Sequence, residues 1–229
     1  MKKVLFIILI SCFSLTIISC SEEKEESSAT GNTDNTTTTS SDSTASFLAV
    51  GQSGRILTSS NGTSWDNRSS GTTSNLIGVT YGNSKFLTLT GSMYSNSVAT
   101  ILTSSDGTTW NSSNSVTCSS CEDNSSNFSL NDVTYGNSTY VAVGQSGRIL
   151  TSSNGTSWDN RSSGTSSNLI GVTYGNSKFL TLTGSMDNDT AATILTSSDG
   201  TTWTSTSVTC SSCADNSSTI SLNDVTYAE

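Results

Sequence analysis

Two Cys-x-x-Cys motifs are the residues of this sequence best suited to chemistry. They are Cys118-Ser119-Ser120-Cys121 and Cys210-Ser211-Ser212-Cys213. Thiolates at this spacing bind zinc in a reducing compartment, whereas in an oxidising one each pair closes a small disulfide loop. Because the chain begins with features of an export signal, we expect two local disulfides. A disulfide or zinc link between the two loops is one alternative, and a redox-active thiol is another.

Two aspartates form the second candidate site. Asp132 and Asp224 stand where the related segments have Gly78 and Gly171, on strands expected to be innermost in a ring. Two carboxylates that face a central tunnel from opposite sides could hold a hard cation such as calcium. The alternative is that each caps a nearby turn. We expect no other cofactor.

The composition excludes several kinds of function. The 229 residues contain no His and no Pro, so His-dependent catalysis and His metal ligands are ruled out. The formal net charge is -9, which argues against a nucleic acid partner because phosphates need Lys and Arg to neutralise them.

The amino terminus looks like a targeting segment. Lys2 and Lys3 precede an apolar stretch, Val4 to Ile18, and Cys20 follows it two residues later. The ending Ile17-Ile18-Ser19-Cys20 resembles the bacterial lipobox, which implies a signal peptide over residues 1–19 and a lipid on Cys20. We therefore expect residues 20–45, which lack large apolar side chains, to be a tether. The resemblance implies a lipid-anchored protein of the bacterial outer membrane or cell surface.

The rest of the chain is built from repeats. A segment that begins at Val50 recurs almost unchanged from Val143, a period of 93 residues, and each unit has two related halves. Four Trp mark the halves, at spacings of 45, 48 and 45 residues: Trp65, Trp110, Trp158 and Trp203. About 46 residues per repeat is the length of one propeller blade.

Each half reads as four short strands. In the third half, strand-like runs at 130–135, 140–143, 148–152 and 157–161 are separated by turn residues, and Asn154-Gly155 predicts a hairpin. We predict an all-β propeller of four four-stranded blades, at about 46–72, 73–125, 126–165 and 166–221. Residues 222–229 would complete the first blade and close the ring, since the first half lacks its leading strand. An eight-bladed ring of two chains is the alternative, so we expect a monomer or a homodimer.

The turns around the four Trp carry a family resemblance. Ser104-Ser105-Asp106-Gly107-Thr108-Thr109-Trp110 and its counterparts resemble the Asp-box, or bacterial neuraminidase repeat, of sialidase-like propellers. The four turns depart from the family pattern because they have one residue fewer between Asp and Gly. In two of them Asn takes the place of Asp. In such a turn the Asp or Asn bonds the backbone, Gly takes a positive φ and Trp is buried. The resemblance implies a structural role for these pairs: Asn61 and Trp65, Asp106 and Trp110, Asn154 and Trp158, Asp199 and Trp203.

The differences between the two units suggest a recognition surface. Residues 94–98 differ at every position from residues 187–191, whereas the preceding segment is nearly identical. A second variable zone, 111–129 against 204–221, falls on the same predicted face. We expect this face to bind a ligand through loop residues such as Tyr94, Asn96, Asp187 and Asp189. The alternative is that the sequences of these long loops have diverged without a functional reason.

These observations favour a non-catalytic binding protein with a glycan or protein partner. A sialidase-like glycoside hydrolase is an alternative, but after the tether the only Glu are Glu122 and Glu229, and the four Arg form two repeat-related pairs. Similar lipoprotein propellers help to build photosystem II, so a membrane-complex assembly factor is a further alternative. We expect no enzyme activity.

Overall fold

A computed structural model describes residues 45–91, 99–112, 117–118, 129–184, 192–208 and 222–228, all within one compact unit, Ser40–Glu229. The signal peptide, Cys20 and most of the tether lie outside these residues. The described ranges contain no α-helix, only the short 3-10 helices Gln52–Gly54 and Gln145–Gly147. Neither is long and apolar enough to cross a membrane.

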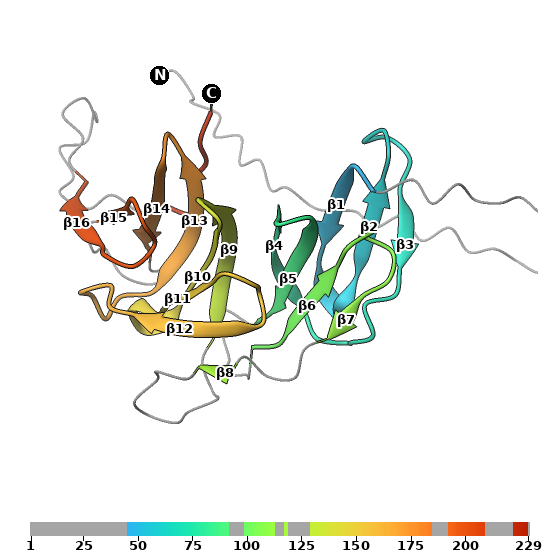
Figure 1. The fold of residues 1–229 in the computed structure, drawn as a ribbon, viewed down its shortest axis with the longest axis horizontal. Helices are drawn as coiled ribbons and strands as arrows, with labels where there is room; N and C mark the ends of the chain where they lie inside the picture. The colour runs from blue at the N-terminus through green and yellow to red at the C-terminus, as the bar shows by residue number, and fades with distance from the viewer. Residues whose placement is uncertain are drawn as a thin grey trace, which may run out of the picture. The chain divides into compact units, whose positions relative to one another are not determined.

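Four antiparallel sheets form the blades of a propeller fold (Figure 1). The first sheet contains β1 (Phe47–Val50), β2 (Ile56–Ser59) and β3 (Asp66–Arg68). The second contains β4 (Leu76–Gly82), β5 (Lys85–Thr90), β6 (Ile101–Ser104) and β7 (Asn111–Ser112). The third contains β9 (Leu130–Gly136), β10 (Thr139–Gly144), β11 (Ile149–Ser152) and β12 (Ser157–Arg161), and β8 (Thr117–Cys118) pairs in parallel with β12. The fourth contains β13 (Leu169–Gly175), β14 (Lys178–Thr183), β15 (Thr193–Ser197) and β16 (Thr204–Ser207). The predicted all-β propeller class is therefore confirmed.

Tight hairpins connect the first two strands of three blades. In β4–β5 the turn residues Asn83 and Ser84 both have positive φ, at 48° and 57°, and the same pair of residue types recurs between β9 and β10 and between β13 and β14. Two positive φ values are typical of the hairpin turn whose twist matches that of the strands. The second strand of each hairpin is largely buried, so the blade core is built from its apolar and Thr side chains.

The innermost strands of neighbouring blades pack through tyrosine and glycine. The ring of Tyr135 on β9 covers Gly82 of β4, and the ring of Tyr174 on β13 covers Gly136 of β9. A Cβ atom at either glycine would collide with the ring, so the absence of a side chain permits this close approach. The inner strands therefore follow the order β4, β9, β13.

The ends of this series differ from the prediction. Residues 222–228 form no assigned strand, and they lie beside β13, with the ring of Tyr227 over Gly175. Among the described strands, β1 pairs only with β2, so the first sheet has three strands. Among the described residues, no strand pairing is assigned between residues 222–228 and β1, the contact that closure of the ring within one chain requires. The carboxyl-terminal segment takes the next place in the inner-strand series, whereas β1 lies at the other end, beyond β4 (Figure 1).

Candidate functional site

The four predicted box turns share one hydrogen-bond pattern. In the second blade, Asp106 Oδ1 accepts from the amides of Thr108 and Thr109 at 2.7 and 2.8 Å, and Ser104 Oγ accepts from the Gly107 amide at 2.8 Å. Gly107 has a φ of 77°. Asn61, Asn154 and Asp199 accept the equivalent pairs of amides. These side chains hold turns and do not point to a ligand.

The carboxylates of two of these turns are stabilised in the ionised form. The backbone hydrogen bonds, above all from Thr109, hold the pKa of Asp106 well below its usual range. The pKa of Asp199 is lowered in the same way, with the largest contribution from the Thr202 amide. Carboxylates that stay ionised and accept backbone amides are poor proton donors, so neither is suited to general acid catalysis.

The four Trp are not equally buried, contrary to expectation. Trp158 is 1% exposed, whereas Trp65 is 41% exposed. β12, which carries Trp158, is covered by β8, and the register places Trp158 opposite Cys118. Trp65 lies just before β3, which has no further strand on its outer side among the described residues. The indoles of Trp110 and Trp203 instead donate to the carbonyls of the turn glycines, both at 3.0 Å.

Asp132 links neighbouring inner strands. Its Oδ1 accepts from the Val133 amide at 2.8 Å, and its Oδ2 accepts from the Val172 amide of β13 at 2.9 Å. Burial, with a smaller contribution from the charge of Asp224, raises the pKa of Asp132 to about 6, although the Val172 and Val133 amides act to lower it. Both oxygens therefore accept backbone amides, one from the adjacent residue and one from the neighbouring inner strand, and the cation site stays a prediction.

Asp224 lies on the other side of β13 from Asp132. Asp224 Oδ1 lies against Gly171 of β13, and it accepts from the Val225 amide at 2.7 Å. The two aspartates thus lie on the two segments that flank β13. The described part of the chain holds no cluster of three or more Cys, Asp or Glu side chains that could bind a metal.

A polar pocket of about 590 Å³ lies where two loops of the first blade meet. One loop joins β1 to β2, and the other follows β3. The pocket is lined by Ser53, Gly54, Arg55, Asn67, Arg68, Ser69, Ser70, Gly71, Thr72 and Thr73. A second pocket of about 470 Å³ occupies the equivalent place in the third blade, and its residues match except that Ser166 replaces Thr73. We call these the arginine pockets.

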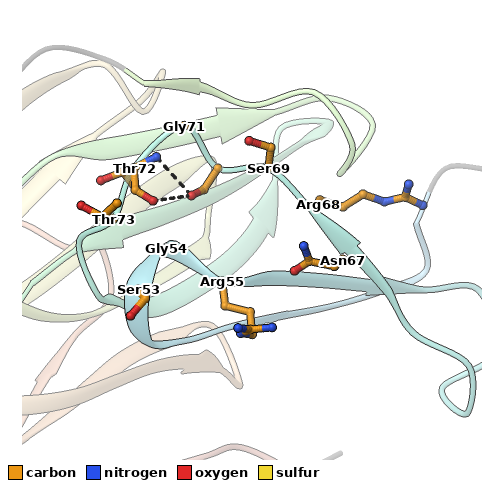
Figure 2. A pocket seen from close by; sticks show the side chains of 10 residues that line it. Ser53, Gly54, Arg55, Asn67, Arg68, Ser69, Gly71, Thr72 and Thr73 are labelled. Carbon is orange, nitrogen blue, oxygen red and sulfur yellow. Dashed lines mark hydrogen bonds between the residues drawn. The ribbon is translucent and has the colours of Figure 1, made fainter. Parts of the chain in front are cut away.

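The backbone of each arginine pocket is held by polar side chains. The Ser53 amide donates to Asn75 Oδ1 at 3.0 Å. Ser70 Oγ donates to the Thr72 carbonyl at 3.2 Å (Figure 2). Ser53 and Gly54 both have positive φ, at 56° and 70°. A Cβ atom at Gly54 would collide with the Thr72 carbonyl, so this glycine lets the two loops touch. The pocket is thus preformed by its own loops.

The arginines have different surroundings. The guanidinium of Arg68 donates to Thr58 Oγ1 at 2.9 Å and forms an ion pair with Asp66 at 3.1 Å. Arg161 in the third blade makes the same contacts with Thr151 and Asp159. Figure 2 shows the side chain of Arg55, which follows the first loop, and that of Arg68, at the end of β3, extending in different directions. No carboxylate lines either pocket, so hydroxyl, amide and guanidinium groups dominate the lining.

The arginine pockets lie at the kind of connection that the sequence analysis selected, but in other blades. The arginine pockets lie between the loop that joins the second and third strands of a blade and the loop that leaves its fourth strand. These are the connections chosen from sequence, but in the first and third blades. Sequence comparison missed them because it looked for positions that differ between the units, whereas the pocket residues are repeated.

Several predicted site residues cannot be placed. Tyr94, Asn96, Asp187 and Asp189 lie outside the described residues, as do Cys121, Cys210 and Cys213. Cys118 lies in β8, where its backbone alone is described. The two local disulfides therefore stay a prediction.

Comparison with known proteins supports the fold. No protein-family model matches the sequence, and no curated protein matches it. Among solved structures, YCF48 bound to D1 peptide is similar with a TM-score of 0.50 and 14% identity, over 72% of this chain and 50% of that one. YCF48 from Cyanidioschyzon merolae gives a TM-score of 0.49 and 18% identity, over 72% and 53%. An α-L-arabinofuranosidase from Clostridium thermocellum gives 0.45 and 14%, over 72% and 64%. The chain thus spans about half the length of the two YCF48 structures, and at these identities the likeness concerns the propeller fold.

Proposed function

We propose that the propeller blades form a non-catalytic binding module, and that each arginine pocket takes an anionic or hydroxyl-rich group of a glycan or protein ligand. The observation that carries the proposal is the duplicate pocket, which presents the same donors twice in one chain. Guanidinium groups recognise carboxylates and phosphates, and Ser, Thr and Asn side chains bond hydroxyl groups. Two pockets in one chain can hold a repetitive ligand at two points, which raises avidity.

A protein ligand has support from the comparison. The similar YCF48 structure contains a bound peptide of D1. A propeller of this type can therefore present a surface to a peptide, which also fits the assembly-factor alternative. Co-purification of an intact membrane complex with the full chain would favour that alternative over glycan binding.

The test is binding of the purified chain to arrays of glycans and peptides that include acidic members. We expect the double variant Arg55→Gln and Arg148→Gln to lose binding. The matched control is Lys85→Gln with Lys178→Gln, a repeat-related pair of cations outside the pockets. A chain that binds equally well in both double variants would contradict the proposal.

A glycoside hydrolase is the second candidate. The observation in its favour is the raised pKa of Asp132 together with the nearby charge of Asp224, because glycoside hydrolysis uses two carboxylates of which one is protonated. Against it, both oxygens of Asp132 accept backbone amides. Hydrolysis of a fluorogenic sialoside that is lost in Asp132→Asn would favour the enzyme.

We also propose that a lipid on Cys20 anchors the module to the bacterial outer membrane or cell surface. The proposal is supported by the sequence that ends at Cys20. Metabolic labelling with a fatty acid, compared between the wild type and Cys20→Ser, tests it. Equal labelling of the two chains would refute the anchor.

A further inference from the structure

The first blade lacks one strand position that the other three blades fill. The second, third and fourth sheets begin with β4, β9 and β13, whereas the first begins with β1, the counterpart of β10. Among the described strands, β1 has a partner on one side only, which is β2. An unpaired strand edge is a template for another strand.

The sequence that fits this position is present near the other end of the described chain. Residues Leu222 to Tyr227 are identical to Leu130 to Tyr135, which form most of β9. The segment is docked on β13 as an inner strand would be, with Tyr227 over Gly175 and Asp224 against Gly171. It has no strand assignment, and among the described strands none is paired with it.

The edge of β1 closely resembles the edge that pairs with β9. β1 reads Phe-Leu-Ala-Val and the matching part of β10 reads Tyr-Val-Ala-Val, and the next five residues, Gly-Gln-Ser-Gly-Arg, are the same after both. β9 and β10 pair with Tyr135 opposite Tyr140 and Val133 opposite Ala142. The same register on β1 sets Tyr227 opposite Phe47 and Val225 opposite Ala49.

The exposed aromatic side chains lie at these two ends. In the third blade Tyr140 is fully buried, and its ring centroid lies 4.6 Å from that of Tyr135. The counterparts Phe47 and Tyr227 are 51% and 44% exposed. Tyr81 on β4, the inner strand next to the unfilled position, is 55% exposed. Only one other large apolar side chain in the described residues, Trp65, is exposed.

We propose that residues 222–227 of a second copy of this chain add to the edge of β1, and that two chains exchange these segments reciprocally. The two ends lie apart within one chain, with β1 beyond β4 and the segment beside β13 (Figure 1). Reciprocal exchange pairs both free edges and buries Phe47 against Tyr227. It also places Asp224 beside Val79 of β4, as Asp132 lies beside Val172. The dimer contains eight blades and a closed ring.

One residue of the segment departs from the inner-strand pattern. Ala228 stands where β9 has Gly136, and a Cβ atom at Gly136 would collide with the Tyr174 ring. In the dimer the Tyr81 ring must therefore pack beside Ala228, where it cannot lie directly over the backbone. Ala228→Gly should remove this obstacle and lower the dissociation constant of the dimer.

The experiment is disulfide trapping with isotope mixing. The full chain with Ala49→Cys and Val225→Cys is prepared in ¹⁴N and ¹⁵N forms, which are mixed before folding and then oxidised. Linked peptides are read by mass spectrometry. The matched control is Ala142→Cys with Val133→Cys, a pair with the same register inside one chain. Its linked peptides should carry one isotope only.

The proposal predicts that about half of the linked 49–225 peptides carry both isotopes, as random pairing of two chains requires. Linked 49–225 peptides of one isotope only would overturn it, because they would show closure within the chain. Absence of the 49–225 link while the control link forms would also overturn it, because β1 would then lack this partner. A mass of one chain in solution for wild type, together with no change in Ala228→Gly, would contradict the dimer independently.

Discussion

The carboxylate of Asp132 on β9 accepts a hydrogen bond of 2.9 Å from the amide of Val172 on β13. The bond joins two blades through their innermost strands, at a position where the neighbouring strands have Gly78 and Gly171. Gly78 makes room for the carboxylate, since a Cβ atom there would lie 2.9 Å from Asp132 Oδ1. The alternation of Asp and Gly therefore belongs to the packing between blades.

Asp132 should make stability fall as the pH rises. Its pKa in the folded protein, about 6, lies above the ordinary pKa of 3.8 for an aspartate. The folded state thus binds more protons than the unfolded state between these values, and the stabilisation present below pH 4 is lost as the pH rises to about 6. The loss should be about 3 kcal/mol or less. Urea unfolding between pH 4 and 7 measures it, and Asp132→Asn should remove most of this slope. An equal slope in the variant would show that another group is responsible.

Asp106 should give stability the opposite pH dependence, so that stability falls as the pH is lowered. Its pKa is lowered, so its contribution is present above about pH 4 and is lost as the pH falls further. Asp106→Asn should cost less than about 1 kcal/mol at pH 7, because Asn61 and Asn154 accept the same amides in their own turns. Asp106→Ala should cost about 1–2 kcal/mol, because it leaves two amides without their acceptor. Denaturant midpoints of the two variants provide the comparison, and equal losses would argue against the role of these bonds.

The unequal burial of two tryptophans should appear as unequal stability losses. Trp158→Ala should destabilise by about 3–5 kcal/mol, because a fully buried ring leaves a cavity. Trp65→Ala should cost about 1–2 kcal/mol, since a large part of its ring is already in water. Trp158→Phe should cost less than Trp158→Ala, because the buried indole N–H has no hydrogen-bond partner among the described residues. Thermal unfolding of the three variants tests this order, and similar losses for Trp65→Ala and Trp158→Ala would contradict it.

The repeats made the blades predictable from the sequence. Alternating apolar and Thr residues between Asn-Ser and Asn-Gly or Asp-Gly turns determine strands locally, and the regular Trp spacing sets the blade length. The hydrogen bonds of Asn61 and Asp106 also follow from local spacing. Closure could not be predicted in the same way, because residues 222–227 have identical pairing preferences for any edge like that of β1.

The arginine pockets were not predictable for a different reason. Arg55 and Thr72 lie 17 positions apart in the sequence, and their proximity follows from the contact between two loops that Gly54 permits. Likewise, the fully buried Trp158 and the exposed Trp65 have the same local sequence, so packing with other segments, such as the pairing of β12 with β8, distinguishes them. Local patterns predict strands and turns, whereas packing between loops and blades forms the site.

The most direct test of the proposed function is array binding by the wild-type chain beside the two matched double variants. The proposal predicts that the wild type binds ligands that carry acidic or hydroxyl-rich groups, that Arg55→Gln with Arg148→Gln abolishes this binding, and that Lys85→Gln with Lys178→Gln retains it. Binding that survives loss of both arginines, or a folded wild-type chain that binds no such ligand, would contradict the assignment of the arginine pockets as the recognition site.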